Sequence, residues 1–338
     1  MKMYGLEQPP CIPVDLRISR GVPPAGDDMI YVGSGKAALA LILSYLKIKG
    51  ALPNKMTPIL VPEWLGTWVY TQILPYAFPT VHTDVNTPIV LCYHQYGFPQ
   101  NMDKVLEMAE TRNAIVIEDC AHAARSFYNG KSLGSMGEFG FFSFSKFLFC
   151  YALGGVLARD PEFRAFVSEQ DAKASSRLRL FVNGLKFFTE WANGRDQPRV
   201  TQMFQGLTAM AYARYGEQVA AGSRALGLWL SKRDAEMEAR RVNFRLLRAT
   251  ADRFGICGHL EVENVTPYAV PLYVKEERAG LLVSELQKRG VASGIYHFDF
   301  ARCVFEPDFR RCVLVPIHSR MTGRGMELVV DAIGKCLH

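Results

Sequence analysis

Short apolar runs alternate with longer stretches of helical periodicity through the first half of this chain. The segments 36–46, 65–73 and 102–109 carry apolar residues at the spacing of amphipathic helices. Between and after them we expect strands at residues 59–61, 80–82, 89–92, 114–118, 140–144 and 155–158. This alternation predicts an α/β fold with a largely parallel sheet, in which ligands bind at the carboxyl ends of the strands.

The second half of the chain changes character twice. Residues 162–247 have a helical pattern, on whose polar side Arg240 and Arg241 would lie. Mixed structure follows, with expected strands at residues 267–274 and 312–317 and expected helices at residues 276–289 and 325–336. We therefore expect a large domain over residues 1–245, which includes the N-terminal segment and the helical region 162–245, and a small α/β domain over residues 246–338.

Composition argues against a disordered chain, a nucleic-acid-binding protein and an exported protein. The chain has 338 residues, of which 49% are hydrophobic and 21% charged, as in ordinary globular proteins. Its formal charge of +6 includes no long basic block, which favours a phosphorylated small molecule over nucleic acid as the anionic partner. Eight cysteines without a Cys-x-x-Cys pair, and a start without an apolar signal, lead us to expect reduced thiols and a cytoplasmic protein.

One window has nearly the length of a membrane span. Residues 139–157 are almost all apolar or small, but Lys146 lies near their middle. A charge at that depth costs roughly 2.5–3.5 kcal/mol, and the pair Gly154-Gly155 weakens the span further. The sequence therefore predicts no association with a membrane.

A glycine-rich turn precedes the first expected helix. Ser34 is a natural N-cap, and the free amides around Gly35 and Lys36 would receive a phosphate at the positive end of the helix. The turn is not a Walker A loop, because Ile30 stands where the first glycine should be and Ala37 replaces the Ser/Thr that binds magnesium. A helix cap without a ligand remains the alternative.

An acid and a lysine are placed as pyridoxal phosphate (PLP) chemistry requires. Asp119 ends an apolar strand, where it could pair with the protonated ring nitrogen of PLP, cap a helix, or bind a metal together with His122. Lys146 lies 27 residues later among phenylalanines, which would lower the pKa of its amine and leave it neutral for imine formation. A lysine that merely reaches solvent is the alternative. Ser143 and Ser145 could contact the cofactor phosphate or cap the turn.

Taken together, these segments resemble the DegT/StrS-type sugar aminotransferases, PLP-dependent enzymes of the aspartate aminotransferase fold (fold type I). The resemblance spans most of the chain, in the order residues 34–39, 61–62, 67–71, 94–97, 117–123, 134–137, 142–146 and 154–155. It implies a large domain with a mostly parallel central sheet flanked by helices, and a smaller α/β C-terminal domain.

The resemblance also implies roles for individual residues, with no metal among the ligands. Lys146 would form the internal aldimine, Asp119 would bind the ring nitrogen, and His122 would replace a glutamine that contacts the ring hydroxyl. The remaining contacts would come from Ser34, Gly35 and Lys36 at the phosphate, from the hydroxyl of Ser143 or Ser145, and from Trp68, or its neighbour Trp64, on the face of the ring.

The activity implied is transfer of an amino group from an amino acid, glutamate in the family, to a keto-sugar that is most often nucleotide-linked. The family acts in nucleotide-sugar and polysaccharide biosynthesis and works as homodimers. This chain departs from the family pattern in the short spacing between Ser143 and Lys146, in Lys36, and in the absence of an acid before Gly154. The alternative is a catalytically altered or non-catalytic member of the same fold that serves binding or assembly.

Overall fold

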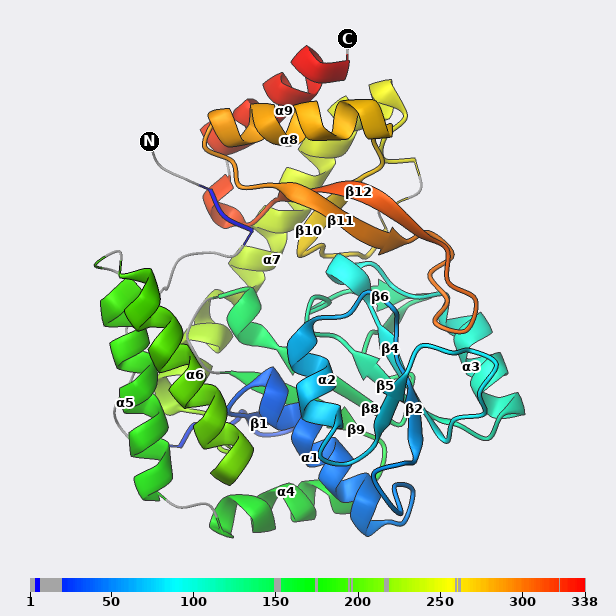
Figure 1. The fold of residues 1–338 in the computed structure, drawn as a ribbon, viewed down its shortest axis with the longest axis vertical. Coiled ribbons are helices and arrows are strands. Elements are labelled where there is room, and N and C mark those ends of the chain that lie inside the picture. Colours follow the sequence, from blue (N-terminus) through cyan, green and yellow to red (C-terminus); the bar gives the residue numbers. More distant parts are fainter. Residues whose placement is uncertain are drawn as a thin grey trace.

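The computed structural model describes residues 4–6, 20–148, 153–173, 176–193, 195, 197–215, 219–258, 260, 263–321 and 323–337. Its centre is a seven-stranded sheet with helices on both faces (Figure 1). In sheet order the strands are β1 (Ile30–Val32), β9 (Gly154–Ala158), β8 (Phe139–Ser143), β5 (Ile115–Asp119), β4 (Ile89–Tyr93), β2 (Pro58–Leu60) and β3 (Phe78–Thr80).

Six of the seven strands run in one direction, and only β9 runs antiparallel to its neighbours, β1 and β8. Of the six strands that the sequence predicts here, five (β2, β4, β5, β8 and β9) lie in place, whereas β3 begins two residues before the predicted run at residues 80–82. The parallel pairing places the carboxyl ends of β4, β5 and β8 side by side, with Tyr93 opposite Asp119 and Asp119 opposite Phe141. This is the edge at which an open α/β sheet binds ligands.

Alternate side chains of the strands face two separate cores. Ile89 and Leu91 pack into the core under α1 (Gly35–Ile48), α2 (Thr67–Ile73) and α4 (Glu162–Lys173). Val90 and Cys92 pack into the other, with α3 (Met102–Thr111) and α7 (Ser223–Ala251). Burial on both faces explains why the strands read as continuous apolar runs.

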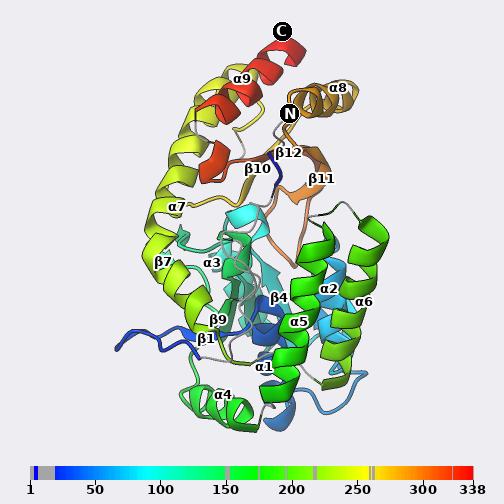
Figure 2. The same ribbon diagram turned by 90° about the vertical axis from the view of Figure 1, so that its left-hand side faces the viewer.

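A smaller unit lies above the carboxyl edge of the sheet (Figure 1). It contains a three-stranded antiparallel sheet in the order β10 (Ala269–Leu272), β12 (Phe309–Pro316), β11 (Gly294–Asp299), covered by α8 (Glu276–Lys288) and α9 (Arg324–Leu337). The sequence predicts all of these elements except β11. The predicted domain boundary at residue 245 falls within α7, which lies beside both units and packs against α9 (Figure 2), so the division into two domains stays a prediction.

The remaining elements are short or peripheral. A hairpin of β6 (Phe127–Tyr128) and β7 (Lys131–Ser132) follows β5, and single 3-10 turns lie at η1 (Gln95–Gly97), η2 (Phe144–Lys146), η3 (Asp252–Phe254) and η4 (Ser319–Met321). The helices α5 (Ser176–Asn193) and α6 (Pro198–Tyr215) form a hairpin beside the sheet domain (Figures 1 and 2). Within the described residues, no helix combines the length and the apolarity that a bilayer crossing requires.

Candidate active site

Asp119 is the last residue of β5, and its carboxylate lies inside the protein with 1% of the residue exposed. Oδ1 accepts a hydrogen bond from the Ala121 N–H at 2.9 Å, so the acid caps a turn; no helix begins there. Burial raises the pKa of Asp119 to about 7, although the Ala121 amide and the charge of Lys146 pull it down. The acid is therefore poised to share a proton with a basic ring nitrogen.

Lys146 ends η2, directly after β8, and is half-buried. Its Nζ lies 5.8 Å from the centre of the Tyr268 ring, and its charge acts on both Asp119 and His122. Because β8 is the parallel neighbour of β5, residues that follow the two strands meet at one edge of the sheet. The two residues that the sequence singles out for PLP chemistry are thus neighbours in the fold.

His122 lies in an aromatic cage beside these two residues. Its ring stacks on Tyr268 with centroids 4.2 Å apart and planes 3° apart, and Tyr96 lies over it with centroids 6.0 Å apart. Nδ1 is 2.6 Å from the hydroxyl of Tyr93. Burial raises the pKa of that phenol well above its usual value, so Tyr93 keeps its proton and its hydroxyl donates a hydrogen bond to Nδ1.

The Tyr93 hydrogen bond fixes the tautomer of His122. Burial, together with the charges of Lys146 and Arg240, lowers the pKa of His122 well below its usual value, so the ring is neutral. With Nδ1 accepting, the proton resides on Nε2. Nε2 is buried and has no hydrogen-bond partner within the described residues. A buried donor without an acceptor is costly, and a ligand oxygen would satisfy it.

The first turn of α1 meets the end of β8. Ser34 caps the helix, with its Oγ accepting from the Ala37 N–H at 3.0 Å. A Cβ at Gly35 would lie 2.8 Å from Cβ of Ser143 and 3.2 Å from its Oγ, and the hydroxyls of Ser143 and Ser145 are 3.4 Å apart. Two hydroxyls therefore lie against a helix N-terminus, where the backbone amides and the helix dipole favour a phosphate.

The remaining predicted residues are Lys36, Trp68 and Trp64. Lys36 is half-buried in the first turn of α1. Trp68 is half-buried in the first turn of α2 and packs against the core beneath that helix. Trp64 instead stacks on His297 of β11, with centroids 3.6 Å apart. The role of either tryptophan on a cofactor face stays a prediction.

The sequence-based prediction does not include several residues of the site. Tyr93 could have been found, because it ends the strand beside Asp119. Tyr268 comes from the distant second half of the chain. Arg240, expected on a polar helix face, is instead fully buried: its Nε donates to Glu236 and its Nη1 to the Tyr268 carbonyl, each at 2.7 Å. Arg240 thereby holds the tyrosine that stacks on His122.

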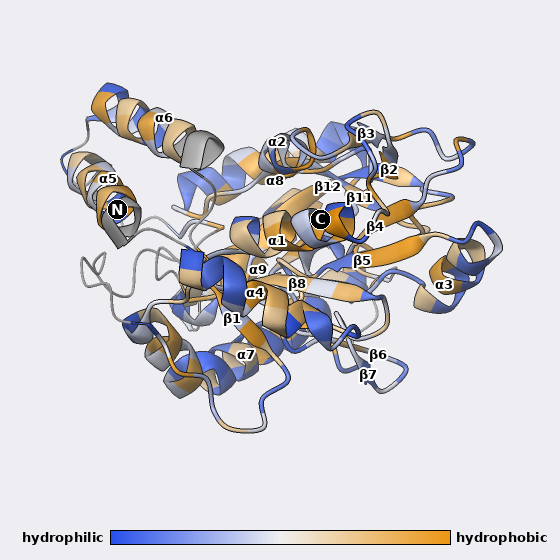
Figure 3. Cartoon of the chain, turned by 90° about the horizontal axis from the view of Figure 1, so that it is seen from below, coloured by the Kyte–Doolittle hydropathy of each residue, from blue (hydrophilic) through white to orange (hydrophobic). Residues whose placement is uncertain are grey.

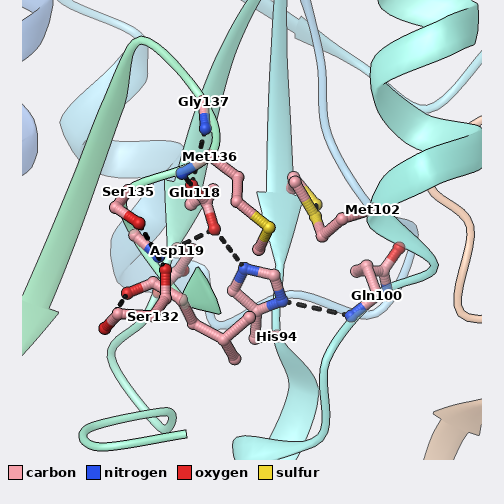
Figure 4. A network of polar contacts seen from close by, with 12 residues as sticks. His94, Gln100, Met102, Glu118, Asp119, Ser132, Ser135, Met136 and Gly137 are labelled. Atoms are coloured by element: carbon pink, nitrogen blue, oxygen red, sulfur yellow. Dashed lines mark hydrogen bonds and ion pairs between the residues drawn. The ribbon is translucent and has the colours of Figure 1, made fainter. Parts of the chain in front are cut away.

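The neighbouring acid, Glu118, points to the other side of β5 and supports the site from behind (Figure 4). It accepts hydrogen bonds from three backbone amides of the turn at residues 134–137, all at 2.7 Å, and from Nε2 of His94 at 3.0 Å. Nδ1 of His94 accepts in turn from the Gln100 N–H. Although His94, Glu118 and Cys120 lie close enough to share a metal, the acid and the imidazole are already engaged in this network.

The segment that carries Asp119 and Lys146 is similar in sequence to known aminotransferases. Residues 82–175, which include the site from Asp119 to Lys146, match the model of the DegT/DnrJ/EryC1/StrS aminotransferase family. A GDP-perosamine synthase of Escherichia coli O157:H7 is 34% identical over 114 residues, or 33% of this chain. A dTDP-3-amino-3,6-dideoxy-alpha-D-galactopyranose transaminase of Aneurinibacillus thermoaerophilus is 33% identical over 119 residues, or 35% of this chain. The chain matches 30% of the length of each of these relatives.

The whole fold has close counterparts among solved structures. A Streptococcus pneumoniae protein solved in its PLP-form superimposes with a TM-score of 0.60, covering 92% of this chain and 88% of that chain at 16% identity. The predicted resemblance to DegT/StrS-type aminotransferases and the predicted fold type I architecture are thus confirmed.

Proposed function

We propose that this chain is a PLP-dependent aminotransferase that moves an amino group from an amino acid to a keto-sugar. The observation that carries the proposal is the meeting of Asp119, His122 and Lys146 at the carboxyl edge of β5 and β8, with the first turn of α1 against the end of β8. These are the groups that a phosphorylated pyridine aldehyde needs: an acid, a hydrogen-bond donor, an amine and a phosphate cradle.

The residues present fit PLP in four respects. Nε2 of His122 is a buried donor that requires an acceptor, and the ring hydroxyl of PLP would supply one. Gly35 lies so close to Ser143 that a side chain there would fill the space at the helix N-terminus. Asp119, with its pKa near 7, would become a carboxylate opposite a protonated ring nitrogen. Lys146 would hold the aldehyde carbon covalently.

We assign the contacts accordingly. The phosphate would lie among Ser34, Gly35, Lys36, Ser143 and Ser145, and Trp68 would cover one face of the ring. When bound, PLP supplies an electron sink for the α-carbon of the amino donor. Lys146 would carry the proton of the transfer, because its free amine could accept the proton of the donor's α-carbon at Nζ and deliver it again. The Tyr93–His122 pair holds a neutral N–H donor in place throughout.

The substrates follow from the relatives and from charge. The two curated relatives carry names of nucleotide-sugar enzymes, and the net charge of +6 suits an anionic acceptor. We propose a nucleotide-linked keto-sugar as acceptor and glutamate as donor, within nucleotide-sugar or polysaccharide biosynthesis. We further propose a cytoplasmic homodimer, as is usual for the family.

The central test is chemical labelling of the lysine. We expect purified protein incubated with PLP to show a visible absorption band, and borohydride reduction to leave a pyridoxyl adduct on the peptide that contains Lys146. The variant Lys146→Ala removes the amine, so it should lose both the band and the adduct. Lys55→Ala, which changes an exposed lysine, is the matched control and should keep both.

The outcome of this test separates catalysis from binding. Glutamate should shift the band of the wild-type protein, because the amino group passes to the cofactor. An adduct on another lysine, or an unchanged band in Lys146→Ala, would contradict the assignment. A Lys146 adduct without any response to amino donors would favour the alternative of a non-catalytic member of the family.

A further inference from the structure

The hairpin of α5 and α6 is a second feature of the molecule, separate from the active site. The two helices pack chiefly against each other, through Val182 and Leu185 of α5 and Phe204 and Ala211 of α6. The hairpin stands beside the sheet domain in two perpendicular views (Figures 1 and 2). Its inner faces are thus accounted for, whereas its outer faces are not.

Both outer faces are apolar. On α5 the exposed side chains include Leu180, Phe187 and Trp191, which recur at the spacing of one helix face, with 49%, 39% and 41% of their surface exposed. Phe181 on α5 and Met203, Leu207 and Met210 on α6 are also exposed. Phe188 is partly exposed but stacks on Phe204 of α6, so it belongs to the contact between the two helices. Apolar residues cover much of both helices (Figure 3). A helix that is apolar on opposite faces is expected to be covered on both.

The hairpin is also strongly basic. Residues 176–215 contain six basic residues and two acidic ones, so they carry a net charge of +4 in a chain whose total is +6. Arg195 and Arg199 are exposed, and the guanidinium of Arg195 lies 4.3 Å above the centre of the Trp191 ring. Aromatic side chains interleaved with arginine are typical of segments that lie at the surface of an anionic bilayer.

Charge decides between the possible occupants of this surface. A second copy of the hairpin would bring two positive surfaces together, and like charges in contact oppose association. Nucleic acid would match the charge but leave the row of Leu180, Phe187 and Trp191 in water. An anionic lipid interface satisfies both properties, because headgroup phosphates accept the arginines while the apolar rings enter the acyl boundary.

We propose that the α5–α6 hairpin is a docking surface for anionic lipid bilayers, on which the chain lies without crossing. This revises the expectation of no membrane association, which concerned a span through the apolar window at residues 139–157. The proposal does not depend on the aminotransferase activity, since the hairpin contributes none of the residues assigned to PLP.

The test is sedimentation of the full chain with two kinds of vesicle. We expect binding to vesicles of phosphatidylcholine mixed with phosphatidylglycerol, little binding to phosphatidylcholine alone, and release by high salt. The pair Phe187→Ser and Trp191→Ser should weaken binding about tenfold or more, and so should Arg195→Glu with Arg199→Glu. The charge-reversal pair changes only exposed residues, so it keeps the test valid if the apolar pair impairs folding.

Matched controls and the contrary outcomes complete the design. Leu281→Ser on α8 changes an equally exposed apolar residue outside the hairpin and should leave binding intact. Equal binding to both vesicles, or no binding to either, would overturn the proposal. A soluble dimer that the Phe187/Trp191 pair splits, without vesicle binding, would assign the surface to a second copy instead.

Discussion

At the scale of single residues, the burial of Asp119 lowers the stability of the protein without cofactor as pH rises. Burial raises its pKa to about 7 from a usual value near 3.9. Between about pH 4 and pH 7 the unfolded chain has released this proton while the native protein keeps it, so the native state is favoured most below pH 4 and loses stability as pH rises to 7. Above pH 7 the protein without cofactor holds a buried carboxylate.

We therefore expect Asp119→Asn to stabilise the protein without cofactor at alkaline pH. The amide keeps an oxygen for the Ala121 N–H and removes the buried charge. About three pKa units correspond to a gain of about 4 kcal/mol at pH 8, falling to little at pH 4. Urea unfolding at several pH values would measure this gain.

The same variant should bind PLP poorly, because it cannot neutralise the protonated ring nitrogen. A gain in stability that does not depend on pH would show that the carboxylate is solvated in the native state. Retention of PLP affinity by the variant would argue against the contact between Asp119 and the ring.

The residues of the site differ in how far the sequence reveals them. Asp119 and Lys146 can be predicted because each follows an apolar strand, and parallel strands end at one edge. The cage around His122 cannot, because Tyr268 lies far away in sequence and comes from outside the central sheet. Arg240 misleads for a related reason. Its i,i+4 pair with Glu236 is visible in the sequence but is typical of an exposed helix face, and the contact with the Tyr268 carbonyl, which helps to make the buried charge tolerable, comes from a distant part of the chain.

At the scale of elements, the start of α1 depends on a close approach by β9. A Cβ on Gly154 would lie 2.3 Å from the carbonyl carbon and oxygen of Ser34 and 2.6 Å from the amide nitrogen of Gly35. These are backbone atoms, so they cannot move aside as a flexible side chain would. The glycine thus allows the strand to support the helix turn that we assign to the phosphate.

We expect Gly154→Ala to lower the free energy of unfolding by roughly 1–3 kcal/mol, because the extra methyl group overpacks this contact. It should also weaken PLP binding, since the α1 amides must shift. Gly280→Ala is the matched control: Gly280 is exposed in α8 with nothing within 4 Å of the added methyl, so helix propensity should raise stability by roughly 0.5–1 kcal/mol. Urea unfolding and PLP titration would test both, and equal effects of the two alanines would contradict the account.

The elements that the sequence predicts best are those whose own residues are apolar because both of their faces are buried. The runs at β4, β5 and β8 are apolar because both faces of the sheet are covered. By contrast β11 has exposed side chains at Ile295 and Tyr296, and it is a strand because it pairs with β12 along its whole length. Its structure is decided by a partner far along the chain, which a local pattern does not reveal.

At the scale of the whole molecule, one buried glutamine joins the sheet domain to the C-terminal unit. Gln95 of η1 is 4% exposed; its Nε2 donates to the carbonyl of His297 at 2.6 Å and its Oε1 accepts from the Asp299 N–H at 3.0 Å. Both partners lie on β11. Because Tyr268 also comes from this half of the chain, the site is complete only while the two units stay together.

We expect Gln95→Glu to loosen this junction in a manner that depends on pH. The carboxylate keeps an acceptor for Asp299 but turns its second oxygen toward the His297 carbonyl, where a donor is needed, so unfolding should become easier by about 2–4 kcal/mol near neutral pH. Acidification should restore part of this loss, because a protonated glutamic acid can donate to that carbonyl as the amide does.

Gln205→Glu, on the exposed side of α6, is the matched control and should change stability by less than about 0.5 kcal/mol. Urea unfolding of both variants across pH 5 to 8 distinguishes the cases. A loss that is the same at every pH would place its cause in packing, and no loss would show that the units are held together by other contacts, such as the stacking of Trp64 on His297.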